Sequence, residues 1–167
     1  QFAVTRNAVP TPVITGSALV CVGATGSVYS VTNVIGNTYA WTVVGGSITA
    51  GTGTNSITVT WGAAGPGTVD VTETETATTC SAAATQFAVT INALPTVTWP
   101  DVLTNQCVNS TTYTLSGGSP DGGVYSGAGV TGANFNASVA GVGAHVLTYT
   151  YTDGNSCENS VTNNITV

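Results

Sequence analysis

The sequence contains almost no positive charge. Lysine is absent, Arg6 is the only arginine, and seven acidic residues give the 167-residue chain a formal net charge of −6. Charged residues make up 5% of the chain, compared with about 25% in a typical soluble domain. Nucleic acids and anionic lipid surfaces are both bound through clustered cations, so the composition argues against either partner.

Several other features are missing. No apolar run approaches the ~20 residues that cross a bilayer, and no helix-length stretch has a 3.6-residue period. The low charge and many β-branched residues argue against disorder. With His145 as the only histidine and few acids, the sequence predicts no enzyme. The chain opens at Gln1 without a charged region followed by an apolar run. We therefore expect a mature protein whose signal was removed, or a segment of a longer one.

What is present favours β-structure, because valine, threonine, glycine and alanine dominate. Apolar and polar residues alternate with a period of two, which predicts strands with one buried face, in residues 38–43, 56–61, 68–72 and 146–152. Glycine-rich turns separate these runs. Short strands at this spacing around a central tryptophan favour an immunoglobulin-like sandwich in each half of an all-β chain.

An internal repeat divides the chain. Residues 1–11 read QFAVTRNAVPT and residues 86–96 read QFAVTINALPT, identical at nine of eleven positions. Pro10 precedes Cys21 by eleven residues, and Pro95 precedes Cys107 by twelve. We therefore predict an N-terminal strand (residues 1–7), a first domain (residues 8–94) and a second domain (residues 95–167).

Each predicted domain contains two cysteines, which suggests disulfides and an oxidising compartment. The sequence allows three pairings, and the domain boundary favours Cys21–Cys80 and Cys107–Cys157. Free buried thiols are the alternative. A zinc site is disfavoured, because no CxxC spacing occurs and His145 stands alone.

Several segments resemble a known family. In the first domain they are Tyr39-Ala40-Trp41 and residues 45–48, 51–55 and 57–61, and in the second they are residues 115–120, 122–127 and 149–155, with Cys157. The first domain resembles the PKD-like repeats of Bacteroidota surface proteins, and the second resembles a companion Ig-like repeat. The resemblance implies two tandem PKD-like or Ig-like sandwiches in a secreted adhesin or fibre protein, often exported by the type IX route. It implies no catalytic residues and no cofactor.

Ligand sites are weakly indicated. Glu73 and Glu75 are interpreted as part of a solvated turn, and His145 as a packing or capping residue. Calcium prefers several converging oxygens, which makes four residues weak candidates: Asp121, Asp153, Asn155 and Glu158. Ordinary Asp and Asn turns explain the same pattern. Otherwise we expect no metal.

Sugars are considered both as a modification and as a ligand. Three sequons mark possible glycosylation sites, at Asn109, Asn136 and Asn164. Carbohydrate binding would need exposed aromatic platforms, but Trp41 and Trp61 share strand faces with core residues. Trp99, which follows the joint, is placed between the domains.

The duplicated N-terminal segment is the most informative feature. Both domains already contain a last strand, at residues 86–92 and 160–167, so residues 1–7 are a further copy. A lone strand cannot satisfy its own backbone groups. It either adds to a neighbouring copy or completes a preceding domain of a longer chain. A frayed tail, or addition to its own domain's edge, is the alternative. The predicted assembly strand consists of Gln1, Phe2, Ala3, Val4, Thr5, Arg6 and Asn7.

The sequence therefore predicts a non-enzymatic, extracellular structural protein of the cell surface. Its units would join head to tail by β-strand complementation into a homopolymeric filament or adhesin stalk, because such a contact does not close on itself. A surface glycan is a possible further partner. The alternative function is a carbohydrate-binding accessory module of a secreted glycoside hydrolase.

Overall fold

A computed structural model describes residues 6–167 of the chain. It divides into two compact units, unit 1 (Gln1–Ala93) and unit 2 (Leu94–Val167), each with its own hydrophobic cluster.

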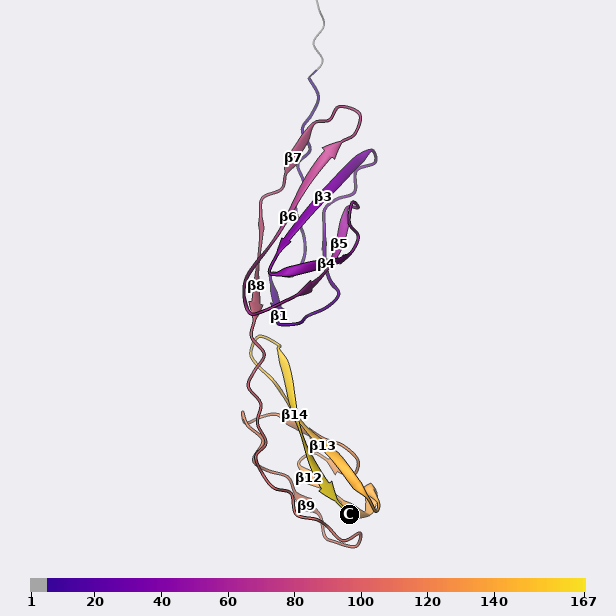
Figure 1. Cartoon of the computed structure of the whole chain (residues 1–167), viewed down its shortest axis with the longest axis vertical. Coiled ribbons are helices and arrows are strands. Elements are labelled where there is room, and N and C mark those ends of the chain that lie inside the picture. The colour runs from indigo at the N-terminus through magenta and orange to yellow at the C-terminus, as the bar shows by residue number, and fades with distance from the viewer. Residues whose placement is uncertain (1–5) are drawn as a thin grey trace, which may run out of the picture. The chain divides into compact units, whose positions relative to one another are not determined.

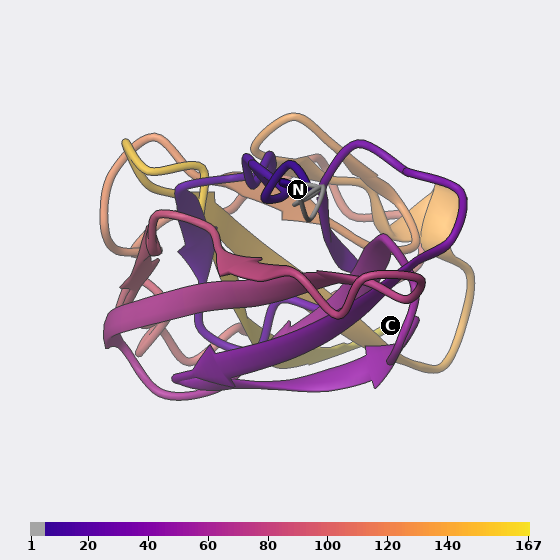
Figure 2. The same cartoon turned by 90° about the horizontal axis from the view of Figure 1, so that it is seen from above.

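Unit 1 is built from two β-sheets. The larger has the strand order β1-β8-β6-β3, with β7 also paired to β6, and contains β1 (Leu19–Cys21), β3 (Asn37–Val44), β6 (Gly65–Glu75), β7 (Ser81–Ala83) and β8 (Phe87–Asn92). The smaller has the order β2-β5-β4, and contains β2 (Ser27–Ser30), β4 (Gly46–Ala50) and β5 (Ser56–Trp61). The long strands β3 and β6 run antiparallel side by side (Figures 1 and 2).

The predicted alternation is confirmed in these strands. In β5 every second residue is buried, and Trp61 is only 1% exposed. Trp41 in β3 and Val69 and Val71 in β6 are buried in the same cluster. The side chains facing inward from the two sheets therefore form one sandwich core, with polar residues, mostly threonines, on the outward faces.

Tyr29 lies in this core, and its hydroxyl makes the stability of the folded state depend on pH. Its side chain is fully buried, its ring packs edge-on against Trp61, and its hydroxyl donates a 2.7 Å hydrogen bond to the Ser17 carbonyl. Burial raises the pKa of Tyr29 above its usual value of 10.0, because desolvation disfavours the phenolate.

This pKa shift predicts a loss of stability in alkali. The folded state holds the Tyr29 proton more tightly than the unfolded chain does. The stability that this proton contributes is therefore complete below pH 10, and it is lost as the pH rises through the pKa of Tyr29 in the folded state. Tyr29→Phe should cost about 1 kcal/mol near neutral pH through the lost hydrogen bond. Above pH 10 it should lose stability less steeply than the wild type. Urea unfolding from pH 7 to 12 measures both slopes, and equal slopes would contradict the prediction.

Unit 2 contains two three-stranded sheets. One has the order β10-β13-β14, and contains β10 (Val124–Ser126), β13 (Ala144–Thr152) and β14 (Glu158–Thr166). The other has the order β11-β12-β9, and contains β9 (Tyr113–Thr114), β11 (Val130–Thr131) and β12 (Asn134–Phe135). A single helical turn, α1 (Ala137–Ala140), begins where the Asn136 side chain accepts hydrogen bonds from the Ser138 and Val139 amides.

The core of unit 2 contains Phe135, Leu147, Tyr149 and Trp99. The Tyr149 hydroxyl donates to the Pro120 carbonyl at 2.6 Å and accepts from the Gly123 amide at 2.9 Å, which anchors the glycine-rich loop before β10. Trp99 is 6% exposed and donates to the Ser116 carbonyl. Its predicted place between the domains is therefore wrong, because the indole belongs to the core of unit 2.

Both units have a long strand that defines two ends. In unit 1, Gly65 at the start of β6 pairs with Ile91 near the end of β8, whereas Glu75 at its other end enters the turn before β7. In unit 2, β14 starts after the β13–β14 turn and ends at Thr166. We call the turn side the hairpin end of each unit, and the side where its last strand finishes the exit end.

Candidate functional site

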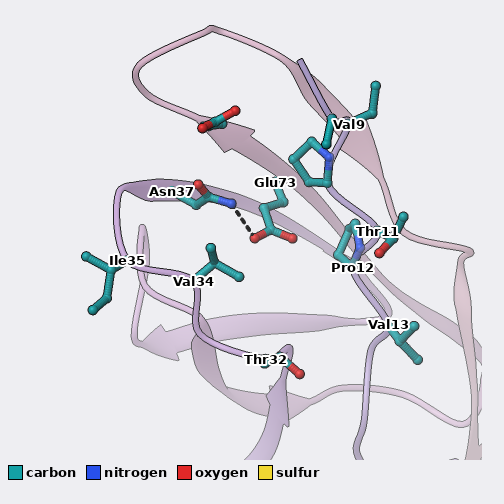
Figure 3. Close-up of a pocket in the computed structure, with 12 residues that line it drawn as sticks. Val9, Thr11, Pro12, Val13, Thr32, Val34, Ile35, Asn37 and Glu73 are labelled. Atoms are coloured by element: carbon teal, nitrogen blue, oxygen red, sulfur yellow. Dashed lines mark hydrogen bonds between the residues drawn. The ribbon is translucent and has the colours of Figure 1, made fainter. Parts of the chain in front are cut away.

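The predicted assembly strand is only partly described. Residues 1–5 lie outside the described residues, while Arg6 and Asn7 are exposed and belong to no strand. The chain then continues through residues 8–13 along the hairpin end of unit 1 (Figure 3). Residues 8–13 therefore lie at the hairpin end of unit 1.

The internal copy of this segment shows what such a sequence does inside a unit. It forms β8, which lies between β6 and β1 and is hydrogen-bonded to both. Val89 and Ile91 are 3% and 2% exposed, whereas Ala88 and Thr90 face outward. The repeated sequence is thus suited to a sheet with one face buried.

A cavity of about 490 Å³ opens at the hairpin end of unit 1. Its lining includes Pro12, Val34, Asn37 and Glu73 (Figure 3). Glu73 is only 3% exposed, and its carboxylate accepts a 2.7 Å hydrogen bond from the Asn37 amide. The site therefore combines apolar walls with a buried, hydrogen-bonded carboxyl group.

The interpretation of Glu73 as part of a solvated turn is wrong. Glu73 lies in β6, where the period of two places it on the same face as Val69 and Val71. Glu75, two residues later, is half-buried and also lines the cavity. These two carboxyl groups are the only titratable side chains in the described lining, and neither hydrogen-bonds to a histidine.

The hairpin end also exposes apolar side chains that the sequence analysis missed. Ile35 is 98% exposed and the adjacent Val34 is 45% exposed, and Val9, in another part of the cavity lining, is 56% exposed. The loop is fixed to the β6–β7 turn, because the Thr76 amide donates to the Gly36 carbonyl at 3.0 Å. Two adjacent apolar residues in a loop otherwise formed by threonine, asparagine and glycine were the signal in the sequence. These residues form an apolar surface suited to contact with another protein.

The predicted disulfide pairings within each domain are wrong. Cys80 and Cys107 carry free thiols, whereas Cys21 and Cys157 are disulfide-bonded. In unit 1, Cys21 lies opposite Asn92 at the exit end, and the Cys80 carbonyl accepts from the Glu75 amide at the hairpin end. The ten-residue rise along β6 separates these ends by roughly 33 Å, and a disulfide requires Cα atoms within about 7 Å.

The same obstacle occurs in unit 2. Cys157 directly precedes β14 at the hairpin end, and Cys107 follows Gln106, whose amide donates to the Thr166 carbonyl at the exit end. The eight-residue rise between Glu158 and Thr166 is roughly 26 Å. Both pairs therefore span the length of a unit.

A family comparison matches the chain to the model of the PKD-like domain over residues 7–91. This match covers just over half of the chain and coincides with unit 1. The chain belongs to the PKD-like domain family. A comparison with the curated proteins found no match.

The match includes both sheets of unit 1 and extends to Ile91 in β8. The PKD-like domain of this chain is therefore a β-sandwich whose last strand is the internal copy of the N-terminal segment. The resemblance noted on the residues of the first domain is thereby confirmed at the level of this family.

Two of the four calcium candidates, Asp153 and Glu158, already accept hydrogen bonds within the chain, whereas Asp121 is exposed on another loop. The Asp153 carboxylate accepts from the Asn155 and Cys157 amides at 2.8 and 2.9 Å, as in an ordinary Asx turn. Glu158 contacts the Thr152 hydroxyl at 3.5 Å. Across residues 6–167, no group of three or more histidine, cysteine or acidic residues could hold a metal ion.

Two of the three sequons present an exposed asparagine. Asn109 and Asn164 are exposed, whereas Asn136 is half-buried and its side-chain oxygen caps α1. His145 hydrogen-bonds through Nε2 to the Gly141 carbonyl at 2.8 Å and packs beside Phe135, as a packing residue would. In the described part of the chain, no helix is long and apolar enough to cross a membrane.

Proposed function

We propose that this chain is a non-enzymatic, extracellular structural protein. It acts as a subunit or repeat unit of a bacterial surface filament or adhesin, whose units join head to tail by β-strand complementation. A PKD-like domain is consistent with an extracellular structural or adhesive module, and disulfide-bonded cysteines are consistent with an oxidising compartment. The duplication of β8 at the N-terminus is the observation that carries the proposal.

We place the extra strand outside unit 1. The slot between β6 and β1 is already filled by β8, so a second copy of that sequence needs a different sheet edge. Residues 8–13, which follow the segment, lie at the hairpin end of unit 1, and a strand of seven residues reaches roughly 23 Å. That length covers most of a strand in an adjoining unit.

The edge of β14 is the acceptor that we favour. β14 pairs with β13 on one side and forms the edge of its sheet. On the other side, Asn159 and Asn163 reach the Pro95 and Asp101 carbonyls through their side chains, at 2.9 and 2.6 Å, and the Thr166 carbonyl at the end of β14 accepts from the Gln106 amide at 2.9 Å. Before Thr166 the edge is contacted through side chains, which leaves backbone groups for an added strand.

Arg6 fits this acceptor better than the slot of β8. It stands where the internal copy has the buried residue Ile91, and an unpaired guanidinium in that position would be strongly destabilising. Beside β14, the carbonyl of the half-buried Asp101 accepts from Asn163, and its carboxylate accepts from the Ser116 hydroxyl at 3.3 Å and has room for a further donor. Arg6 would therefore favour an acidic edge of a neighbouring unit over a purely apolar slot.

The test is the concentration dependence of assembly. Sedimentation velocity and negative-stain microscopy of the purified chain should show polymers that lengthen with protein concentration. A monomer at every concentration would contradict the proposal, and retention of that monomer on an insoluble polysaccharide would support a carbohydrate-binding module. The burial of Trp41, Trp61 and Trp99 leaves no tryptophan platform for the second outcome.

A further inference from the structure

Each unit has one free thiol, which lies at the hairpin end in unit 1 and at the exit end in unit 2. Cys80 is half-buried at the hairpin end of unit 1, and Cys107 is exposed at the exit end of unit 2. Backbone hydrogen bonds fix both positions. The Cys80 carbonyl accepts from the Glu75 amide at 2.9 Å, and the Cys107 amide donates to the Ser110 hydroxyl at 2.9 Å. Neither thiol lies on a loosely held tail.

The two units repeat the same pair of cysteine positions. Cys80 and Cys157 both lie in the turn that precedes the closing strands of their unit. Cys21 and Cys107 both lie beside the end of the last strand, next to Asn92 and Thr166 respectively. Cys21, at an exit end, and Cys157, at a hairpin end, are disulfide-bonded. The two free thiols are also one of each kind, Cys107 at an exit end and Cys80 at a hairpin end.

We propose that Cys107 of one copy forms an intermolecular disulfide with Cys80 of the next copy. This inference rests on the proposed head-to-tail assembly and gives it a covalent link. The free exit-end cysteine of one subunit meets the free hairpin-end cysteine of its neighbour. Each subunit then contributes one thiol to the junction before it and one to the junction after it.

The surroundings of both thiols are suited to such a junction. Near Cys80, the loop bonded to the β6–β7 turn exposes Ile35 almost completely. Near Cys107, Val108 is 45% exposed, and Val142 is 81% exposed beside Gly143, which exchanges two hydrogen bonds with Val167. Burial of these apolar side chains would hold the two ends together while the thiols react.

Residues 8–13 line the cavity at the same hairpin end. When that end meets the exit end of a preceding copy, we expect the sequence before residue 8 to reach the end of that copy's β14, the proposed acceptor edge. Strand addition and disulfide formation then occur at one junction and require the same direction of assembly.

The chemistry of the link is an ordinary thiol–disulfide exchange. A small-molecule disulfide or the disulfide of an oxidoreductase accepts two electrons. The Cys80 and Cys107 sulfurs form one S–S bond, and the oxidant leaves as two thiols that carry the two protons. The first attack forms a mixed disulfide on one cysteine, and the thiolate of the other displaces it.

The test uses single variants, alone and mixed. Wild-type protein in a glutathione redox buffer should give a ladder on a non-reducing gel, with peptide mapping showing a Cys80–Cys107 link. Cys80→Ser and Cys107→Ser should each abolish bands beyond a dimer. An equimolar mixture should give a covalent heterodimer joined through Cys107 of the first variant and Cys80 of the second. The proposal would be overturned if Cys80–Cys80 or Cys107–Cys107 links formed in this mixture as often as Cys80–Cys107 links.

A matched control tests whether any exposed thiol reacts. Val28 is 56% exposed on β2, so Val28→Cys in the Cys80→Ser background supplies an accessible thiol away from the hairpin end. It should restore less than a tenth of the ladder, and full restoration would overturn the proposal. Microscopy separates the two claims. Filaments without a Cys80–Cys107 link would overturn the disulfide and leave strand complementation standing, whereas neither filaments nor a ladder would overturn both.

Discussion

Replacing Val4 by aspartate is expected to shorten the filaments to monomers and short oligomers, as deletion of residues 1–7 should also do. Val4 corresponds to Val89 of β8, which is 3% exposed in unit 1. If the N-terminal segment adds to a sheet in the same way, an aspartate there would bring a carboxylate into an apolar layer. That burial is costly unless the charge is paired. A loss of about 1.4 kcal/mol per junction already weakens it tenfold.

The neighbouring residue supplies the control. Thr5 corresponds to Thr90, which faces outward from β8, so Thr5→Asp should leave filament length within about twofold. Both variants carry the same added charge and differ only in the face that they alter. The measurement is the length distribution by negative stain at matched protein concentrations. Equal shortening by the two variants would indicate a charge effect on a tail and would contradict strand addition.

The strands were predictable wherever one face of a sheet is buried. Trp41, Val59 and Leu147 are buried in β3, β5 and β13, and in each case the residues beside them along the strand face outward or are only partly buried. A period of two depends only on neighbouring residues, and it can therefore be recognised in the sequence alone. The strands of two or three residues in unit 2 are too short to show such a period, and none of them was predicted.

The cysteine pairing could not be derived from the domain boundary. Which ends of a unit Cys21 and Cys80 occupy depends on the antiparallel pairing of β6 with β8, which is a non-local property. A partial signal was nevertheless present, because the similar spacing from Pro10 to Cys21 and from Pro95 to Cys107 places these two cysteines in equivalent positions. Comparison of the two halves of the sequence therefore indicates which cysteines occupy equivalent positions, but it does not indicate which cysteines are bonded.

Glu73 shows the opposite error. The alternation through Val69 and Val71 places it on the inward face, whereas its charge favours a solvated position. The structure accommodates it because Asn37, two positions from its cross-strand partner Tyr39, supplies a donor. A buried carboxyl group needs such a partner, and a partner on another strand is not visible in a local pattern.

Trp61→Ala is expected to have the largest effect on stability. Trp61 is 1% exposed, and the Tyr29 ring packs against it with centroids 5.8 Å apart. The sequence makes room for the indole with two glycines. A Cβ on Gly67 would lie 2.7 Å from its Cζ3 atom, and a Cβ on Gly46 would lie 2.9 Å from its Cε3 atom. Because neighbours this closely fitted cannot collapse into the cavity, the variant should lose about 3–5 kcal/mol of unfolding free energy.

The same variant tests whether the two units fold independently. A loss of 3–5 kcal/mol is a large part of the ~5–15 kcal/mol that stabilises a typical domain, so unit 1 should unfold at much lower urea concentration. Unit 2 has a separate core around Phe135, which is fully buried. Phe135→Ala should therefore destabilise unit 2 and leave the unit 1 transition in place.

Urea unfolding followed by hydrogen exchange of each unit measures these transitions. Val28→Ala, at an exposed position, is the control and should change neither transition by more than about 0.5 kcal/mol. A single transition that both core variants shift equally would show that the two cores unfold together.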